Sequence, residues 1–314
     1  MFSLIIVDYN SISKTLKYID HCIEKFYGQE FNIIIVDNSY TDETLESILE
    51  CSLIKETIYE QKKIYIYEYR EHNLVLVKSN ENLGYAKGNN LGAKVSNYFY
   101  KEDYLIFSNN DLKFTDNINL LEFINIFTRN NDIAVIGPKI VGIDGRPQSP
   151  RKYNNIWRQL ILYFPNILLC NILTKYITNI DYSNESKYTY WVMGCFIVVD
   201  SNKFFETGMF DENTFLYAEE MILSERMLKK GYKNYFYNDI EVVHEHGQTV
   251  KKTMSILSGM EESFKSNCYY FKNYKNVSKI DLILAKVSFK IFKRLFPIKC
   301  CMKKYIQYVV RRKI

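Results

Sequence analysis

Long apolar runs are absent from this 314-residue chain: no stretch of about 20 apolar residues occurs, so no helix is expected to span a bilayer. The opening residues, Met1 to Val7, are apolar but have no basic start and lead directly into Asp8, so we expect no signal peptide. The seven cysteines show no metal-ligand spacing. Their odd, irregular set predicts reduced thiols in the cytoplasm.

The sequence also lacks internal repeats and low-complexity linkers. Hydrophobic residues make up 47% of the chain and aromatic residues 16%, which excludes disorder for most of it. The length suits one large domain, or one domain with a small extension.

Acidic residues are scarce at the carboxyl end. Residues 272–314 hold 13 Lys or Arg against one acid, Asp281, which is a net charge of +12. Because the whole chain carries +5, the other 271 residues carry −7. A mildly acidic body is not typical of nucleic-acid-binding proteins, so no nucleic acid partner is expected.

Short apolar runs alternate with helical patterns over the first 140 residues. This β–α repetition predicts an α/β fold with a mostly parallel, Rossmann-like central sheet and helices on both faces. The predicted strands are Leu4–Val7, Ile33–Val36, Ile64–Tyr69, Leu74–Val77, Tyr104–Phe107 and Ile133–Ile136, with helices around Leu16–Phe26, after Thr41, near Gly88–Asn97 and over Leu120–Phe127.

The second half of the chain has a less regular pattern, and residues 151–188 show only weak periodicity. Asp144-Gly145 marks a turn typical of a hairpin. The further predictions are a strand over Tyr190–Val199 interrupted by Gly194, a helix over Tyr217–Lys230 that ends at Gly231, and two strands, Lys233–Tyr237 and Ile240–Val243.

Polar side chains follow several of the predicted strands. Because ligands of open α/β sheets bind beyond the carboxyl ends of the strands, these residues are the first candidates for a site. One such cluster alone is commonly a cap or a turn, but a series on one edge favours a shared polar ligand. The clusters are Asp8-Tyr9-Asn10, Asp37-Asn38-Ser39, Asn80 to Asn90 and Asn109-Asn110-Asp111.

Seven segments occur in an order that resembles a known family: IIVDYNS, IIIVDNSYTDET, NENLGYAKGNNLGA, YLIFSNNDLKF, WVMGCFIVV, FDENTFLYAEEMILSERMLKKGY and VVHEHGQT. Together they are similar to the inverting family 2 glycosyltransferases, in particular the bacterial rhamnosyltransferase-like branch. The resemblance implies an A-type glycosyltransferase fold over residues 1–270, with a nucleotide-binding half (1–140) and an acceptor-binding half (141–270). Residues 271–314 would form a basic, helical, amphipathic extension.

The resemblance also implies an activity, the transfer of a sugar from a UDP- or dTDP-sugar to a glycan or lipid-linked glycan in cell-surface polysaccharide synthesis. For the donor base, it implies contact with Asp37, with Tyr9 and Asn10 beside it; Asp37 could instead cap the next helix. A Gly- and Asn-rich turn can bring backbone N–H groups close to phosphate, although such turns are often only structural. Its donor-binding candidates are Asn82, Gly84, Asn89 and Asn90.

The segment after Tyr104–Phe107 corresponds to the metal–diphosphate site of the family. Asp111 supplies an oxygen ligand suited to Mg²⁺ or Mn²⁺, and Asn109 and Asn110 would contact the donor. The resemblance places His244 at the metal and diphosphate. Alternatively, Asn109–Asp111 could be an ordinary polar turn, and His244 could be a histidine bonded to backbone.

An inverting transfer requires a carboxylate that takes the proton of the acceptor hydroxyl. The resemblance assigns this role to Glu220, with Glu219 as a supporting or acceptor-binding acid; both could instead complement the helix dipole. On the acceptor side, the candidates are Trp191, Gly194 and Asp211, for which core packing is the alternative.

The basic carboxyl end mixes Lys and Arg with apolar residues. Its apolar cluster, Ile291, Phe292, Leu295 and Phe296, precedes Pro297, which we expect to break the segment. Such an element can lie on an anionic membrane, or it can pack on the main domain with a solvated basic face. A membrane surface is the favoured partner, since similar enzymes use polyprenyl-linked acceptors; the protein would be peripheral on the inner face of the cell membrane.

The sequence leaves two rival functions. A sugar nucleotidyltransferase shares a similar sheet, but it carries a Gly-rich, basic loop after the first strand, which DYNSIS lacks. The other rival function is a non-catalytic sugar- or lipid-binding module on a transferase scaffold. It is supported by Asn109 and Glu220, which stand where the family has aspartates.

Overall fold

The computed structural model describes residues 1–41, 43–48, 52–245 and 255–311 of the chain. The chain divides into two compact units. The first unit consists of Met1–Lys152 and Ile180–Met254, and the second of Tyr153–Asn179 and Ser255–Ile314. The second unit therefore takes a segment from the middle of the chain, whereas the sequence-based division was a single boundary at residue 270.

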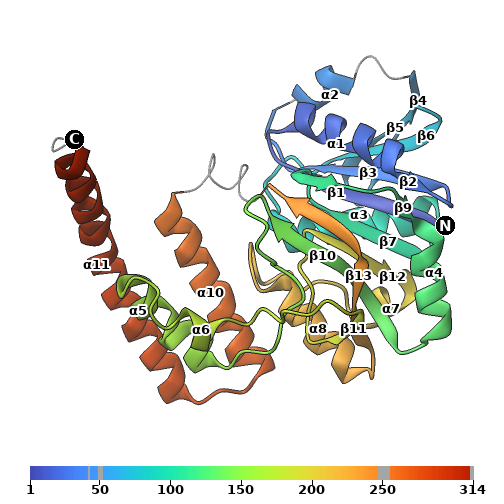
Figure 1. The fold of residues 1–314 in the computed structure, drawn as a ribbon. Helices are drawn as coiled ribbons and strands as arrows, with labels where there is room; N and C mark the ends of the chain where they lie inside the picture. Colours follow the sequence, from blue (N-terminus) through green and yellow to red (C-terminus); the bar gives the residue numbers. More distant parts are fainter. Residues whose placement is uncertain (42, 49–51, 246–254, 312–314) are drawn as a thin grey trace. The chain divides into compact units, whose positions relative to one another are not determined.

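The first unit is built on one large mixed sheet (Figure 1). Its strands lie in the order β11-β13-β10-β12-β7-β1-β3-β6-β5-β4, and β8 pairs with β13. The bounds are β1 Phe2–Asp8, β3 Phe31–Asp37, β4 Ser52–Tyr59, β5 Lys62–Tyr69, β6 His72–Lys78, β7 Tyr104–Ser108, β8 Leu112–Phe114, β10 Ile133–Gly142, β11 Lys187–Thr189, β12 Phe196–Asp200 and β13 Lys233–His244; a separate pair joins β2 (Phe26–Tyr27) to β9 (Ile118–Asn119).

The centre of this sheet is parallel. Strands β6, β3, β1 and β7 are joined by three parallel ladders, and β10 pairs with β13 in parallel as well. In the ladder of β1 with β3, Asp8 is the partner of Asp37, and in that of β3 with β6, Asp37 is the partner of Lys78. The carboxyl ends of β1, β3 and β6 therefore meet at one edge, as the polar clusters predicted.

Helices cover both faces of the sheet because successive side chains of its central strands, which point to opposite faces, are nearly all apolar and buried. From β1, Leu4 and Ile6 join one core with α1 (Ile12–Lys25) and α4 (Leu120–Arg129). Ile5 joins the opposite core with α3 (Gly84–Phe99), α7 (Ser201–Glu206) and α8 (Glu219–Lys229). The predicted fold class, a largely parallel α/β sheet with helices on both faces, is thereby confirmed.

Some elements differ from the sequence-based expectation. Strand β4 was not predicted, because its side chains are mostly exposed and give no apolar run. Only the second part of Tyr190–Val199 is a strand, and the two strands expected over 233–243 form the single strand β13. The hairpin turn at Asp144-Gly145 is present, since Gly142 N–H donates to the Arg146 carbonyl and Val141 pairs with Pro147.

The second unit is helical: η1 (Trp157–Ile161), α5 (Tyr163–Leu168), α6 (Thr174–Ile177), α10 (Ile256–Tyr274) and α11 (Lys279–Arg311). Its core is aromatic. Phe164 of α5 lies against Phe264 of α10 and against Phe289 and Phe292 of α11, with ring centroids 4.7–5.7 Å apart.

Helix α11 continues through Pro297, so the predicted break at this residue is wrong. Proline removes one backbone donor and disfavours a helix interior, but the packing of a long apolar face outweighs that local cost. In the part of the chain that the structure describes, no helix combines the length and apolarity needed to cross a membrane.

Candidate active site

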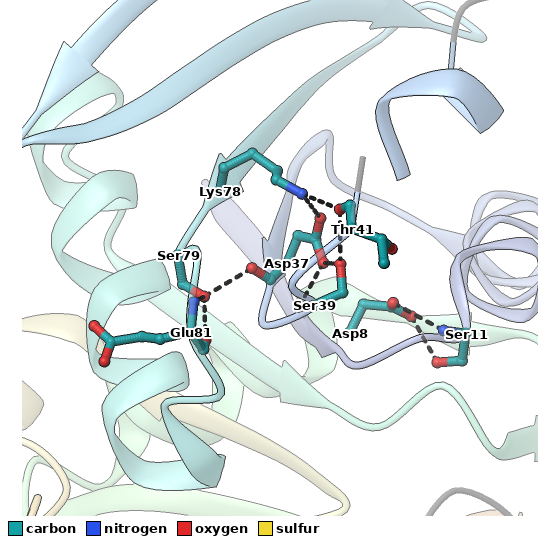
Figure 2. Close-up of polar contacts among 8 residues, drawn as sticks. All are labelled: Asp8, Ser11, Asp37, Ser39, Thr41, Lys78, Ser79 and Glu81. Carbon is teal, nitrogen blue, oxygen red and sulfur yellow. Dashed lines mark hydrogen bonds and ion pairs between the residues drawn. The ribbon is translucent and has the colours of Figure 1, made fainter. Parts of the chain in front are cut away.

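The carboxyl ends of β3 and β6 hold a buried ion pair (Figure 2). Lys78 Nζ lies 2.9 Å from Asp37 Oδ2, and the side chains are 4% and 0% exposed. Lys78 also donates to the Thr41 carbonyl, and the Ser39 backbone N–H and hydroxyl donate to Asp37 Oδ1. Because a cation and two further donors satisfy it, the Asp37 carboxylate is fixed in place at the end of its strand.

Asp8, the neighbour of Asp37 in the sheet, has a fully buried side chain that is bonded within the protein. It accepts hydrogen bonds from the Ser11 backbone and from the hydroxyls of Ser11 and Thr15, which fixes the turn into α1. The Asn110 amide donates to Thr15 Oγ1 at 2.7 Å and to Ser11 Oγ at 3.0 Å. Burial raises the pKa of Asp8, and the Asp37 charge contributes to this rise.

Tyr9 and Asn10 follow β1 directly. Asn10 is exposed and has a positive φ of 51°, a conformation that asparagine tolerates better than most residues. Tyr9 is partly buried. The structure thus leaves both at the sheet edge near Asp37, and their contact with a donor base stays a prediction.

The Gly- and Asn-rich segment forms the entry to α3. Asn82 Oδ1 accepts the N–H of Gly84, whose φ of +73° and position against Phe215 leave no room for a side chain: a Cβ would lie 2.4 Å from the Phe215 carbonyl oxygen. The Tyr85 N–H donates to that same oxygen. This glycine therefore permits a close contact between α3 and the loop that precedes α8.

Asn89 and Asn90 are both buried in α3 and bonded to the protein. Asn89 donates to the Tyr85 carbonyl, and Asn90 bonds the N–H and carbonyl of Phe210 and the Glu212 carboxylate. These bonds show how the two amides hold neighbouring backbone. The assignment of Asn89 and Asn90 to the donor remains a prediction.

The segment after β7 is joined to the segment before β12. The Asn109 N–H donates to the Cys195 carbonyl at 2.8 Å, so the backbone of Asn109–Asp111 lies alongside Gly194-Cys195. Burial raises the pKa of the Cys195 thiol, with smaller contributions from the charges of Asp111 and Glu220. The segment that ends in Asp111 is therefore joined by a backbone hydrogen bond to the Gly194-Cys195 segment.

Asp111 and His244 lie together, as the family resemblance implied. His244 Nε2 is 3.4 Å from Asp111 Oδ1, and both side chains are buried. His244 Nδ1 lies 3.0 Å from Gln148 Oε1. With that amide oxygen as acceptor, Nδ1 carries the proton and Nε2 presents its lone pair towards Asp111. Gln148 was not predicted; the Asp144-Gly145 hairpin returns it alongside β10, where its N–H donates to the Ile140 carbonyl.

The chemistry of this pair fits a divalent metal. Ligands at about 2.1 Å from a metal are separated by roughly 3.0–3.4 Å, which is the spacing of these two atoms. A carboxylate, an imidazole and a second group that orients the imidazole are a common metal-binding combination. Among the described residues, no cluster of three or more His, Cys, Asp or Glu side chains is placed to hold a metal ion.

Glu220 is the second residue of α8 and lies against a glycine. The Gly194 N–H donates to Glu220 Oε1 at 2.9 Å, and a Cβ on Gly194 would lie 2.7 Å from that same oxygen. Tyr85 Oη donates to the Gly194 carbonyl at 2.6 Å and so fixes this peptide from the side of α3. Gly194 thus positions the carboxylate through its backbone.

The two adjacent glutamates have different environments. Burial, and then the neighbouring charge of Glu220, raises the pKa of Glu219 well above its usual range. Burial also raises the pKa of Glu220, opposed by backbone N–H groups and the Arg151 cation. Adjacent carboxylates do not readily both ionise here, so we assign the proton to the buried Glu219 and the charge to the partly buried Glu220, which accepts the Gly194 N–H.

The loop before α8 adopts an unusual backbone conformation. Tyr217 and Ala218 have φ values of 72° and 69°, in the left-handed region that non-glycine residues rarely occupy. Two successive residues of this kind direct the first turn of α8 and therefore set where Glu219 and Glu220 lie. Strain of this kind is concentrated at functional sites.

Trp191 and Asp211 are both buried. The Arg151 guanidinium lies 5.3 Å from the centre of the Trp191 ring, and the two residues exchange backbone hydrogen bonds. Arg151 was missed because the weak pattern of residues 151–188 gives no signal for it. Asp211 accepts from Asn213 and pairs with Arg226 at 3.3 Å, which holds the loop before α8. Acceptor contact by Trp191, Gly194 or Asp211 remains a prediction.

Comparison with known proteins gives a consistent result. Residues 3–180 match the family described as glycosyl transferase family 2. The chain is also 25% identical over 253 residues to the O-antigen chain rhamnosyltransferase WbaN of Salmonella anatum, a match that covers 80% of this chain and 68% of that protein.

Solved structures with a similar fold have low sequence identity. One is GalNAc-T7 with UDP, GalNAc and Mn²⁺ (TM-score 0.56, 13% identity, 94% of this chain and 56% of that chain). Another is the mannosyltransferase PcManGT from Pyrobaculum calidifontis with GDP-Man and Mn²⁺ (TM-score 0.55, 11% identity, 98% of this chain and 82% of that chain). At this identity they show the A-type glycosyltransferase fold alone. Because the family match covers more than half of its length, the chain belongs to glycosyl transferase family 2, and it is a glycosyltransferase of the bacterial rhamnosyltransferase-like type.

Proposed function

We propose that this glycosyltransferase moves a sugar from a UDP- or dTDP-sugar to a glycan or lipid-linked glycan in cell-surface polysaccharide synthesis, with inversion at the anomeric carbon. The observation that carries the proposal is the partly buried Glu220 carboxylate, held by the Gly194 N–H next to the segment that ends in Asp111. The residues proposed as the base and the diphosphate site, and the charge-paired Asp37, all belong to the first unit.

The mechanism is a single displacement. Glu220 takes the proton of the acceptor hydroxyl as that oxygen bonds to the anomeric carbon. The bond from the anomeric carbon to the diphosphate oxygen breaks at the same time, and its electron pair leaves with the nucleotide diphosphate. Because attack and departure occur on opposite faces, the anomeric configuration inverts. Glu219, in its protonated form, donates a hydrogen bond towards the acceptor.

The donor is held at the edge of the sheet. The uracil or thymine base would lie at this edge beside Tyr9 and Asn10, on the backbone that the buried Asp37–Lys78 pair holds in place. Asn109 and Asn110, with the α3 entry at Asn82 and Gly84, lie along the diphosphate. Asp111 and His244 would hold Mn²⁺ or Mg²⁺, which would supply positive charge to offset that of the leaving diphosphate.

The acceptor approaches from the side of Trp191 and Gly194. Its lipid-linked form would place the protein at the inner face of the cell membrane, as a peripheral protein. The basic carboxyl end of the chain supports this setting.

Calorimetric titration with UDP, dTDP and GDP tests the donor site. We expect clear binding of UDP or dTDP in Mn²⁺ and a loss of about tenfold or more in affinity in EDTA, because the metal offsets the diphosphate charge. Asp111→Asn should remove most of the Mn²⁺ dependence, whereas Asp116→Asn, at an exposed position, should not. Absence of binding for all three nucleotides would favour the non-catalytic binding module.

The pH profile of transfer tests the assignment of Glu220. Its pKa lies above the ordinary value of 4.5, and only its ionised form accepts a proton, so activity should fall with acidification at a pH above that value. Because the Arg151 cation lowers this pKa, Arg151→Gln should move the acid limb to higher pH. Arg146→Gln, at a side chain 87% exposed, serves as the control. An acid limb unchanged by Arg151→Gln would contradict the assignment.

A further inference from the structure

Helix α11 has two apolar faces, and only one of them is used inside its own unit. The inner face comprises Ala285, Phe289 and Phe292, which are at most 7% exposed. It packs on α5, η1 and α10: Phe289 stacks on Phe264 at 4.3 Å, and Ser288 donates to the Ile161 carbonyl. This packing accounts for the aromatic half of the apolar cluster seen in the sequence.

The outer face is a separate apolar stripe. Residues two positions apart on a helix point about 200° away from each other, so Val287 and Ile291 lie opposite Ala285 and Phe289. Members of the stripe are 38–58% exposed, which is unusual for a row of large aliphatic side chains. We define the outer stripe as Ile283, Leu284, Val287, Ile291, Leu295 and Ile298.

The outer stripe has a border of positive charge. Lys286, Lys290 and Arg294 each precede a stripe residue by one position and are exposed, so they recur every fourth residue along one side of it. After Asp281 the chain contains no acidic residue. The second unit as a whole holds 16 Lys or Arg and 3 Asp or Glu, a net +13, while the rest of the chain carries −8.

We infer that the outer stripe of α11 is a docking surface for an anionic lipid bilayer, in which its aliphatic side chains enter the interface and the basic border contacts lipid phosphates. An aliphatic row bordered by cations matches a surface that is apolar inside and negative outside. A second copy of this chain would bring the two basic borders together, which charge repulsion opposes. The inference rests on the proposed function in one respect only: the lipid-linked acceptor proposed there gives the protein a reason to bind a membrane.

Vesicle flotation of the full chain tests this inference without any sugar transfer. The probes are phosphatidylcholine vesicles with and without phosphatidylglycerol, at low and high salt. We expect flotation only with phosphatidylglycerol, weakened by salt. Val287→Gln/Ile291→Gln/Leu295→Gln should reduce binding by about tenfold or more, and Lys286→Gln/Lys290→Gln/Arg294→Gln should do the same. The matched control is Ile54→Gln/Ile58→Gln/Ile143→Gln, at aliphatic positions 59–73% exposed in the first unit.

Circular dichroism and nucleotide binding of each variant show whether it is folded. Equal flotation of the stripe variant and the unmodified protein would overturn the inference, as would no flotation of the unmodified protein. A dimer that the stripe substitutions convert to monomer, with vesicle binding unchanged, would overturn it in favour of contact between copies. Vesicle binding without nucleotide binding or transfer would overturn the proposed function alone.

Discussion

Glu220→Gln is expected to lower the rate of sugar transfer by about 10²–10⁴-fold, which is the usual contribution of a positioned general base. The amide retains the shape of the side chain and still accepts the Gly194 N–H, but it cannot take the acceptor proton. Nucleotide binding should stay within about twofold, because the base does not contact the nucleotide. Transfer assays with saturating donor and calorimetry on the same preparation measure the two effects.

Two matched replacements make this result specific. Glu219→Gln resembles the protonated acid already present, so transfer should fall by only about tenfold or less, the effect expected of one neutral hydrogen bond. Glu206→Gln, at a carboxylate 48% exposed, should leave transfer unchanged. Full activity of Glu220→Gln, or a greater loss in Glu219→Gln than in Glu220→Gln, would show that the base is assigned to the wrong residue.

Lys78→Met is expected to lower the free energy of unfolding by about 3–5 kcal/mol, the usual cost of leaving one buried charge without its partner. Methionine keeps much of the length of lysine, so the packing changes little while Asp37 loses the cation 2.9 Å away. The donor contacts of the Ser39 hydroxyl and N–H remain but do not neutralise the charge. Urea unfolding followed by circular dichroism measures the change.

Lys139→Met provides the comparison. Lys139 pairs with Glu241 across neighbouring strands at 2.7 Å, but both side chains are about one-third exposed, so its loss should cost about 0–1 kcal/mol. Nucleotide affinity should also fall in Lys78→Met and not in Lys139→Met, because Asp37 would no longer be held in place. Equal losses of stability in the two variants would mean that burial of the Asp37–Lys78 pair does not govern its strength.

The sequence by itself determined the parallel centre of the sheet and the identity of the family. Buried strands of the parallel centre are continuous β-branched runs, and this pattern is visible without any tertiary information, as in Ile33–Val36 within β3. Polar residues after such strands meet at one edge for the same geometric reason, so Asp37 and Asp111 could be predicted as site candidates. The exposed strand β4 could not be predicted in this way, because its pairing with β5, and not its apolar content, defines it.

Only the tertiary structure decided which polar side chains are committed to the protein itself. Lys78, Gln148 and Arg151 carry no local signal, yet each lies against a predicted site residue: Lys78 against Asp37, Gln148 against His244 and Arg151 against Trp191. Their roles depend on contacts between residues that are far apart in sequence. A pattern of residue types along the chain does not record such contacts.

The carboxyl end shows the same limit most clearly. The sequence identified one basic amphipathic element with a single apolar cluster, but packing separates that cluster between two faces of α11, with Phe292 buried and Ile291 exposed. Helical periodicity predicts which residues share a face. Which of two apolar faces is covered depends on the segment Tyr153–Asn179, whose Phe164 fills the inner side, and therefore only the folded unit decides it.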